Sequence, residues 1–357
     1  MGSLLLYIIA FLCSAICAGF YQRKVYKNSN SFKEFVWAGI IMALPIVLAC
    51  YRKGIGIDYD TYELLFNNFH NSTWSSFYYD NSSFEYLNKV LVDLGYFIAG
   101  DVYGVFAVYA ILSLMLFEAA IMHYADKISL PVSTLVFLLL LYPDTLNVIR
   151  QSLACAIVFY SIRYISSGDF KKYLICCLLA TGIHTTAIIT ISFYLFGENI
   201  NSKILNCNIL KIMLVLAPLL LAFNVGLFSS FTLFDRYFSN YDIESTDITI
   251  SYILKMPILL PFLFCLKRLK EDDKAKLLYY LFAMEMMLLF SSSMFKWGFR
   301  LSYYCFFGQI ILVGYITNGS LIKAKISRLY FISWYLLCFY VLFYIWGRSG
   351  IFPYTHF

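Results

Sequence analysis

The chain has 357 residues, of which 61% are hydrophobic and only 13% are charged. A soluble domain carries roughly 25% charged residues, so this composition excludes a water-soluble globular fold. It indicates an all-α polytopic integral membrane protein whose apolar side chains are solvated by lipid. The net charge of +6 fits basic cytoplasmic loops and does not point to nucleic acid as a partner.

A spanning helix needs roughly 20 apolar residues. The stretches that come near this length are 3–20, 35–51, 101–122, 129–142, 151–166, 173–196, 210–227, 251–267, 277–294, 300–317 and 328–347. The first run has no basic residues before it and is followed by Arg23 and Lys24. We therefore interpret it as a retained spanning helix with its N-terminus outside, rather than as a secretory signal. With the uncertain stretches included, the sequence predicts about 10–12 transmembrane helices in a single domain over residues 1–357.

Two polar segments follow the second predicted span. Residues 52–83, rich in Tyr, Asn, Ser and Asp, form the longest non-spanning stretch and are predicted to be an extracytoplasmic loop. The next segment, Phe84–Ala99, has Glu85, Lys89 and Asp93 among its apolar residues. This pattern predicts an amphipathic helix that lies at the membrane interface or dips partway into it.

The lysine-bearing loops are expected to face the cytoplasm, and one run breaks the resulting alternation. Lys172 precedes the run 173–196 and Lys203 follows it, so both of its ends look cytoplasmic. One solution is a pair of half-helices broken near Gly182–Ile183–His184, with protein or a water-filled cavity around the irregular backbone. A continuous helix with one misassigned loop is the alternative, and the sequence does not choose between them.

The ten cysteines lie mostly in apolar runs and form no CxxC pair. This arrangement is typical of cysteines that act as small hydrophobic residues. It supports neither a disulfide framework nor a zinc site, and we expect no metal and no other cofactor.

Apart from Arg348, which we expect to anchor a helix end, four arginines fall on the predicted outer side, where the positive-inside tendency disfavours them: Arg52, Arg150, Arg236 and Arg300. A guanidinium at the rim of an apolar helix is costly to desolvate, and its planar set of donors best fits a carboxylate or a phosphate. We therefore predict that these arginines bind an anion, with Gln151 beside Arg150 as a further polar contact. The alternative is a set of surface ion pairs, which nearby Asp235 makes plausible for Arg236.

The segment 51–62 places a polar cluster directly after a spanning helix. Gly54 and Gly56 permit a tight turn, and Asp58 and Tyr62 would share one face of a helix that follows it. Asp58 could act as a base or bind a sugar hydroxyl, while Tyr59 and Tyr62 could stack on sugar rings. The alternative is a glycine turn followed by an aspartate that caps the helix.

Three further positions carry candidate chemistry. His184 lies in an apolar run. An imidazole has an ordinary pKa of about 6.5, which suits a general base. The alternative is a buried neutral histidine bonded to a backbone carbonyl. Glu85 is the best placed glutamate to face an outer cavity, and Arg300 with Tyr303 and Tyr304 forms another candidate site.

Taken together, these segments resemble the EpsG family within the Wzy-type bacterial polysaccharide polymerases. The resemblance rests on six stretches in order along the chain: GIGIDYDTYELLF (54–66), FEYLNKVLVDLG (84–95), NVIRQSLACAIVFYSIRYI (147–165), LATGIHTTAI (179–188), WGFRLSYY (297–304) and FPYTHF (352–357).

The resemblance implies a metal-independent, inverting glycosyl transfer at the outer face of a bacterial inner membrane, by an enzyme of the GT-C-like class of lipid-donor glycosyltransferases. The donor would be a growing glycan on undecaprenyl pyrophosphate, and the acceptor an incoming lipid-linked repeat unit. A chain-length regulator and a flippase would be partners in the same pathway. Arg150 and Arg300, with Arg52 or Arg236, would neutralise the departing pyrophosphate, and His184, Asp58 or Glu85 would act as the base.

Other classes of protein stay open from the sequence. A transporter or flippase of lipid-linked oligosaccharide would also need cations in a cavity, although such folds usually carry internal repeats, and none is visible here. An O-acyltransferase would also place a histidine at membrane depth. An O-antigen-ligase-like transferase, which moves a finished glycan, is hardly separable from a polymerase by sequence.

Overall fold

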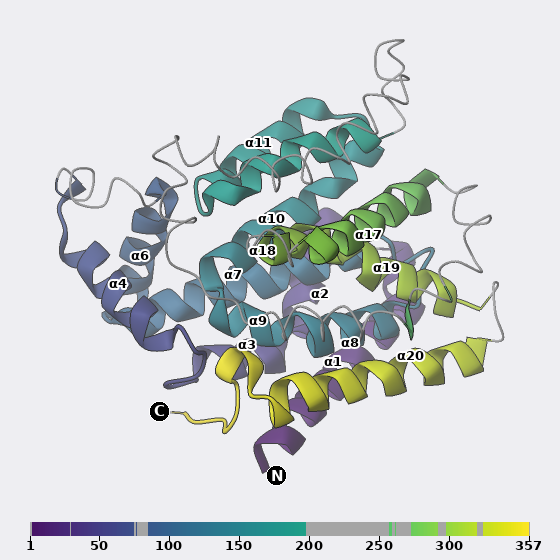
Figure 1. Ribbon diagram of the computed structural model, residues 1–357, viewed down its shortest axis with the longest axis horizontal. Helices are drawn as coiled ribbons and strands as arrows, with labels where there is room; N and C mark the ends of the chain where they lie inside the picture. The colour runs from purple at the N-terminus through teal and green to yellow at the C-terminus, as the bar shows by residue number, and fades with distance from the viewer. Residues whose placement is uncertain are drawn as a thin grey trace. The chain divides into compact units, whose positions relative to one another are not determined.

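The computed structural model describes residues 2–28, 30–74, 76, 85–197, 257–258, 261, 273–291, 298–319 and 324–356, all of them in helices or their connections (Figure 1). The helices are α1 (Gly2–Lys24), η1 (Tyr26–Asn28), α2 (Ser31–Ile41), α3 (Ala43–Cys50), α4 (Tyr59–Asn71), α6 (Tyr86–Ala99), α7 (Val102–Met122), α8 (Leu130–Leu140), α9 (Tyr142–Asn147), α10 (Ile149–Ser166), α11 (Phe170–Thr181), η2 (Thr185–Phe196), α17 (Asp273–Ser291), α18 (Gly298–Ser302), η3 (Tyr303–Cys305), α19 (Phe306–Thr317), α20 (Ala324–Phe339), η4 (Tyr340–Ile345) and η5 (Arg348–Gly350). The predicted all-α polytopic membrane fold is confirmed.

Four helical stretches of the described part are long and apolar enough to cross a membrane: Gly2–Lys24, Val102–Met122, Gly298–Thr317 and Lys325–Ile345. The predicted span 35–51 is a pair of helices, α2 and α3, which meet at Met42 with a bend of 59°. The stretch 129–142 contains only the 11 residues of α8, too few to cross a bilayer alone. The predicted span 210–227 lies outside the described residues, as does nearly all of 251–267.

The run 173–196 is broken as the half-helix alternative predicted, because α11 ends at Thr181 and a 3₁₀ helix, η2, begins at Thr185. The predicted extracytoplasmic segment 52–83 includes α4, in which Phe66 and Phe69 are buried. This amphipathic pattern extends the helix that the sequence offered after the glycine turn. The extracytoplasmic position of the segment stays a prediction.

By contacts, the chain divides into two compact units. The first contains Met1–Arg163, Ile175–Ile188 and Val313–Phe357, and the second contains Tyr164–Leu174 and Ile189–Leu312. In the second unit, α17 packs against α18 and η3. The single domain predicted from the sequence stays a prediction.

The core of the first unit places the helices around the candidate site. Helices α4 and α6 pack on each other and on α7 (Figure 1). The buried side chains between them include Phe66 and Phe69 of α4, Val92 of α6 and Phe106 of α7, together with Leu153 of α10. This hydrophobic cluster also contains Tyr59 and Ile149, at the starts of α4 and α10, and Leu87 in the first turn of α6 packs against it. The starts of these three helices carry the polar residues described next.

Candidate functional site

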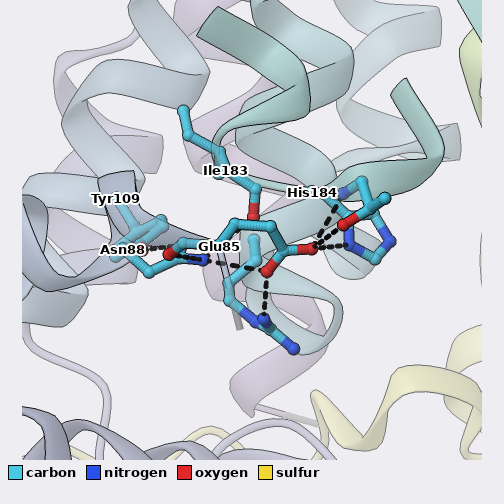
Figure 2. A network of polar contacts seen from close by, with 7 residues as sticks. Glu85, Asn88, Tyr109, Ile183 and His184 are labelled. Carbon is cyan, nitrogen blue, oxygen red and sulfur yellow. Dashed lines mark hydrogen bonds and ion pairs between the residues drawn. The ribbon is translucent and has the colours of Figure 1, made fainter. Parts of the chain in front are cut away.

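The carboxylate of Glu85 is the centre of a buried polar cluster (Figure 2). Its Oε2 accepts a hydrogen bond from Arg150 Nη1 at 2.9 Å. Its Oε1 accepts two bonds from Thr185, from the backbone N–H at 2.8 Å and from the hydroxyl at 2.9 Å. The Nδ1 atom of His184 lies 3.5 Å from the same oxygen. Three segments far apart in sequence therefore meet at one carboxylate.

The cluster forms because the end of one helix and the start of another form hydrogen bonds with each other. The first N–H groups of a helix and the last carbonyls of another have no partner within their own helix. At the break after α11, the Gly182 carbonyl accepts a bond from Leu87 N–H in the first turn of α6, at 3.1 Å. The Ile183 carbonyl accepts a bond from Asn88 Nδ2 at 3.0 Å. The break thus supplies the acceptors that bring His184 beside Glu85.

Asn88 extends this network into the membrane-spanning part of the unit (Figure 2). Besides Ile183, its amide group donates to the backbone carbonyl and to Oε2 of Glu85, both at 3.2 Å. Its Oδ1 accepts a bond from the hydroxyl of Tyr109 on α7 at 2.6 Å. Asn88 is fully buried, so these bonds fix its amide and, through it, the orientation of Glu85.

These neighbours determine the charge on Glu85. Burial alone would raise the pKa of this carboxyl, but His184, the Arg150 charge and the Thr185 N–H lower the pKa to about 2. Glu85 is therefore ionised at neutral pH and is a weak base. Its geometry suits a residue that holds Arg150 and His184 in place.

Arg150 also faces the start of α4. Its Cζ lies 6.0 Å from the ring centroid of Tyr62, within the range of a cation–π contact. Nearby, Asn147 Oδ1 accepts a bond from the backbone N–H of Asp58 at 2.9 Å. Asp58 occupies the N-cap position of α4, although its side chain makes no capping hydrogen bond. Gln151, which follows Arg150, is buried.

Arg52 lies in a different environment, packed among aromatic rings with only 2% of its surface exposed. Its Cζ is 5.2 Å from the ring centroid of Phe106, and Tyr59 stacks on the same ring at 4.8 Å. Within the described part of the chain, Arg52 Nε and Nη1 and the Tyr59 hydroxyl have no hydrogen-bond partner. A buried guanidinium with unused donors is costly, so this position favours a hydrogen-bond acceptor.

The C-terminal segment closes over the loop that carries Arg52. Lys53 N–H donates to the Thr355 carbonyl, and Gly56 N–H donates to the Gly350 carbonyl, both at 3.1 Å. The hydroxyl of Tyr354 donates to the carbonyl of Leu48, at the end of α3, at 3.0 Å. Residues 350–355 at the C-terminal end therefore fix the glycine-containing turn that precedes α4.

A model of the EpsG family matches residues 35–356 of the chain. The chain belongs to the EpsG family. This is a family of polysaccharide polymerase-like membrane proteins. Comparison with curated proteins and with solved structures gave no match.

The EpsG match covers every residue of the Glu85 cluster, and the geometry joins several of the predicted site residues. Glu85, His184 and Arg150, inferred separately from the sequence, are in mutual contact through Glu85. Tyr62 lies beside Arg150, whereas Tyr59 is buried with one ring face against Phe106. Whether these residues bind or transform a substrate stays a prediction.

The remaining predicted residues belong to other parts of this EpsG-family chain. Arg300 lies half-buried in α18, and Tyr303 and Tyr304 are buried in η3, all within the second unit. Their grouping with Arg150 is not tested. Arg236 lies outside the described residues. No group of three or more His, Cys, Asp and Glu side chains suited to a metal ion occurs in the part of the chain that the structure describes.

Three members of the cluster were not among the predicted site residues. Thr185 was visible beside His184, and Asn88 lies three positions after Glu85, on the same face of α6. These two spacings could have indicated them. Tyr109 lies in a continuous apolar run, and no sequence signal distinguishes it from the many other tyrosines.

Proposed function

We propose that this EpsG-family protein polymerises lipid-linked oligosaccharide repeat units. It would transfer the growing glycan from undecaprenyl pyrophosphate to the non-reducing end of an incoming undecaprenyl-pyrophosphate-linked repeat unit. The observation that carries the proposal is the Arg150–Glu85–His184 cluster, formed by three segments that the family model spans. An inverting transfer needs a cation for a diphosphate leaving group and a base for the acceptor hydroxyl, and the cluster offers both.

Arg150 is the proposed contact to the leaving group. A guanidinium carries five N–H donors in a planar array, and the bond to Glu85 Oε2 uses Nη1. The planar guanidinium suits the oxygens of a pyrophosphate, on which negative charge develops as the glycosidic bond breaks. Arg52, whose guanidinium lies over the ring of Phe106, is a second candidate for this role. Arg300 and Arg236 stay candidates for the same role.

His184 is the proposed base. An imidazole whose Nδ1 faces a carboxylate carries its proton on that nitrogen and presents a lone pair on Nε2. Nε2 would accept the proton of the acceptor hydroxyl while the hydroxyl oxygen bonds to the anomeric carbon of the donor sugar. The bond from that carbon to the phosphate oxygen breaks in the same step, and the leaving pyrophosphate takes up the electron pair. Asp58 is the alternative base.

The proposal places the reaction at the outer face of the bacterial inner membrane, with no metal ion. Lipid tails would reach the site laterally between helices, and Tyr62 and Gln151 would contact sugars near Arg150. Tyr303 and Tyr304 would do so beside Arg300. A flippase would deliver the repeat units, and a chain-length regulator would limit the product.

The first test is Arg150→Lys in a strain whose own copy of the gene is deleted. We expect polymer to fall by about 10²–10³-fold, because an ammonium replaces the planar donors that face the charge of the transition state. Polymer and single lipid-linked units are separated on a gel, and units on the outer face are labelled from outside. Arg163→Lys, on the same helix but paired with Glu34 at 3.9 Å, is the matched control.

The two main proposals give different results in this experiment. A polymerase predicts that single units still reach the outer face of the Arg150→Lys strain. A flippase predicts that they remain inside. If the Arg150→Lys strain makes normal polymer and attaches it to the final carrier as usual, Arg150 has no role in the mechanism. If it makes normal polymer that does not reach the final carrier, the protein is a ligase.

The base is tested by His184→Ala. We expect polymer formation to slow by about 10²–10⁴-fold, the usual contribution of a general base. The rate is measured with purified protein as release of polyprenyl pyrophosphate from a lipid-linked repeat unit. Binding of that unit should change little, which separates loss of the base from loss of the fold. A normal rate would exclude His184 and make Asp58 the candidate.

A further inference from the structure

A groove in the first unit lies away from the Glu85 cluster, where α8 packs between α1 and α20. It has a volume of about 560 Å³, within the roughly 300–1,000 Å³ of sites that hold small molecules. Most of its lining is apolar, including Leu12, Ile16 and Phe20 of α1 and Leu135 of α8. Ile16 is 71% exposed, so this wall of the groove has no protein cover in the described part of the chain.

One end of the groove is cationic. Arg23 and Lys24, in the last turn of α1, line it together with Arg328 of α20. None of the three forms an ion pair with an acidic residue among those described. Arg328 Nε donates to the carbonyl of Thr317 at 3.0 Å, which fixes its guanidinium near the groove.

A glutamine holds this end of α1 against the start of α8. Gln22 Nε2 donates to the carbonyls of Ala125 and Ile128 at 2.7 Å and 2.6 Å, and its Oε1 accepts from Leu130 N–H at 3.2 Å. Because Gln22 is fixed in this way, the two basic residues that follow it are held beside the groove. The cationic end is therefore part of the packed structure of the unit.

We propose that this groove binds an anionic membrane lipid, with an acyl chain along its apolar wall and a phosphate between the three cations. An apolar channel with unpaired positive charge at one end is complementary to a molecule that has both parts. A free phosphate would leave the apolar wall uncovered, and an uncharged lipid would leave the cations unpaired.

The position along α1 separates this groove from the proposed catalytic region. The start of α1 contacts the C-terminal segment, since Ser3 Oγ accepts a bond from Tyr354 N–H at 3.1 Å. Arg23 and Lys24 lie at the other end of this 23-residue helix, about 30 Å away at 1.5 Å per residue. The two ends of α1 thus lie near opposite faces of the bilayer. On the predicted orientation the groove faces the cytoplasmic leaflet, whose anionic lipids attract basic residues.

The test uses purified full-length protein in mixed micelles with equal amounts of phosphatidylglycerol and phosphatidylcholine, and native mass spectrometry to count bound lipids. We expect phosphatidylglycerol to be retained preferentially. Arg23→Gln with Lys24→Gln should weaken this preference by about fivefold for each cation removed. Lys171→Gln with Lys172→Gln removes the same charge from two exposed residues outside the groove and should change nothing.

The apolar part of the groove is tested without a change of charge. A Cβ atom at Gly19 would meet only Pro131 carbons, at 3.8 Å, which is ordinary contact. Gly19→Leu should therefore fold, since leucine favours a helix more than glycine does, and its side chain should displace the acyl chain and lower phosphatidylglycerol retention.

Three results would overturn the proposal. One is equal retention of the two lipids by the unaltered protein. A second is an equal loss in the Lys171/Lys172 control, which would indicate a general charge effect. The third is full displacement of phosphatidylglycerol by inorganic phosphate, which would indicate an anion site with no role for the acyl chain.

Discussion

Glu85→Gln is expected to abolish polymer and to destabilise the protein strongly. The change leaves a side chain of nearly the same shape but removes the charge that faces Arg150 and His184. Loss of one partner of a buried ion pair costs about 3–5 kcal/mol, because the other charge stays buried and uncompensated. Thermal unfolding of the purified protein measures this loss, and the gel assay measures polymer. Glu63→Gln, on α4, is a control whose carboxylate forms no ion pair within the described residues.

A double variant separates the two effects of Glu85. Arg150→Gln added to Glu85→Gln removes both buried charges, so much of the lost stability should return. Polymer should stay absent, because the proposed contact to the pyrophosphate is gone as well. If the double variant were as unstable as the sum of the single variants, Glu85 and Arg150 would not be coupled and the cluster would need another explanation.

The same carboxylate sets a limit on acid stability. Its pKa is lowered to about 2 in the folded protein, against about 4.3 for an ordinary glutamate. The stabilisation from its ionised form is therefore complete above about pH 4.3 and is lost as the pH falls toward 2. Glu85→Gln should remove this part of the acid-induced loss of stability.

Gly56→Ala is the second change with a large expected effect. Gly56 has a φ of +111°, a conformation that side chains rarely adopt. A Cβ atom there would lie 2.7 Å from the carbonyl oxygen of Leu146. The strained backbone alone costs about 1–3 kcal/mol, and relief of the clash would move the turn before Asp58 away from α9. We expect little folded protein after fluorescence-detected size-exclusion chromatography, and no polymer.

Gly54→Ala is the matched control. Its φ is +61°, and a Cβ atom there meets nothing within 4 Å. The expected cost is therefore only the left-handed backbone, about 1–2 kcal/mol, and the protein should fold and make polymer. If both variants lost the same amount of folded protein and polymer, backbone strain alone would explain the loss. The close approach of Gly56 to Leu146 would then have no effect.

Composition and loop charge were enough to predict the membrane fold, and the parity of the loops offered the break before His184 as one of two alternatives. Both are local or summed properties of the chain. The cluster itself could not be predicted from the sequence, because Glu85 is 65 residues from Arg150 and 100 residues from Thr185. The sequence therefore offered Glu85 and His184 as competing bases, whereas the structure places them in one network.

The environment of individual side chains could not be predicted from the sequence either. Tyr59 and Tyr62 looked equivalent in sequence, yet the helical turn between them buries Tyr59 on Phe106 and leaves Tyr62 beside Arg150. Arg52 was predicted on the outer side of the membrane, and its neighbours in sequence do not indicate that it is buried against Phe106. These differences arise from tertiary packing, which the order of residues does not express.

The bend between α2 and α3 affects the membrane around the protein. The two helices have 11 and 8 residues and meet at 59°, so together they reach across about 25 Å at most. The hydrocarbon layer of a bilayer is about 30 Å thick. If α2 and α3 cross the membrane as one bent span, the bilayer beside them is expected to be thinner by several ångströms, because a small mismatch costs little per ångström.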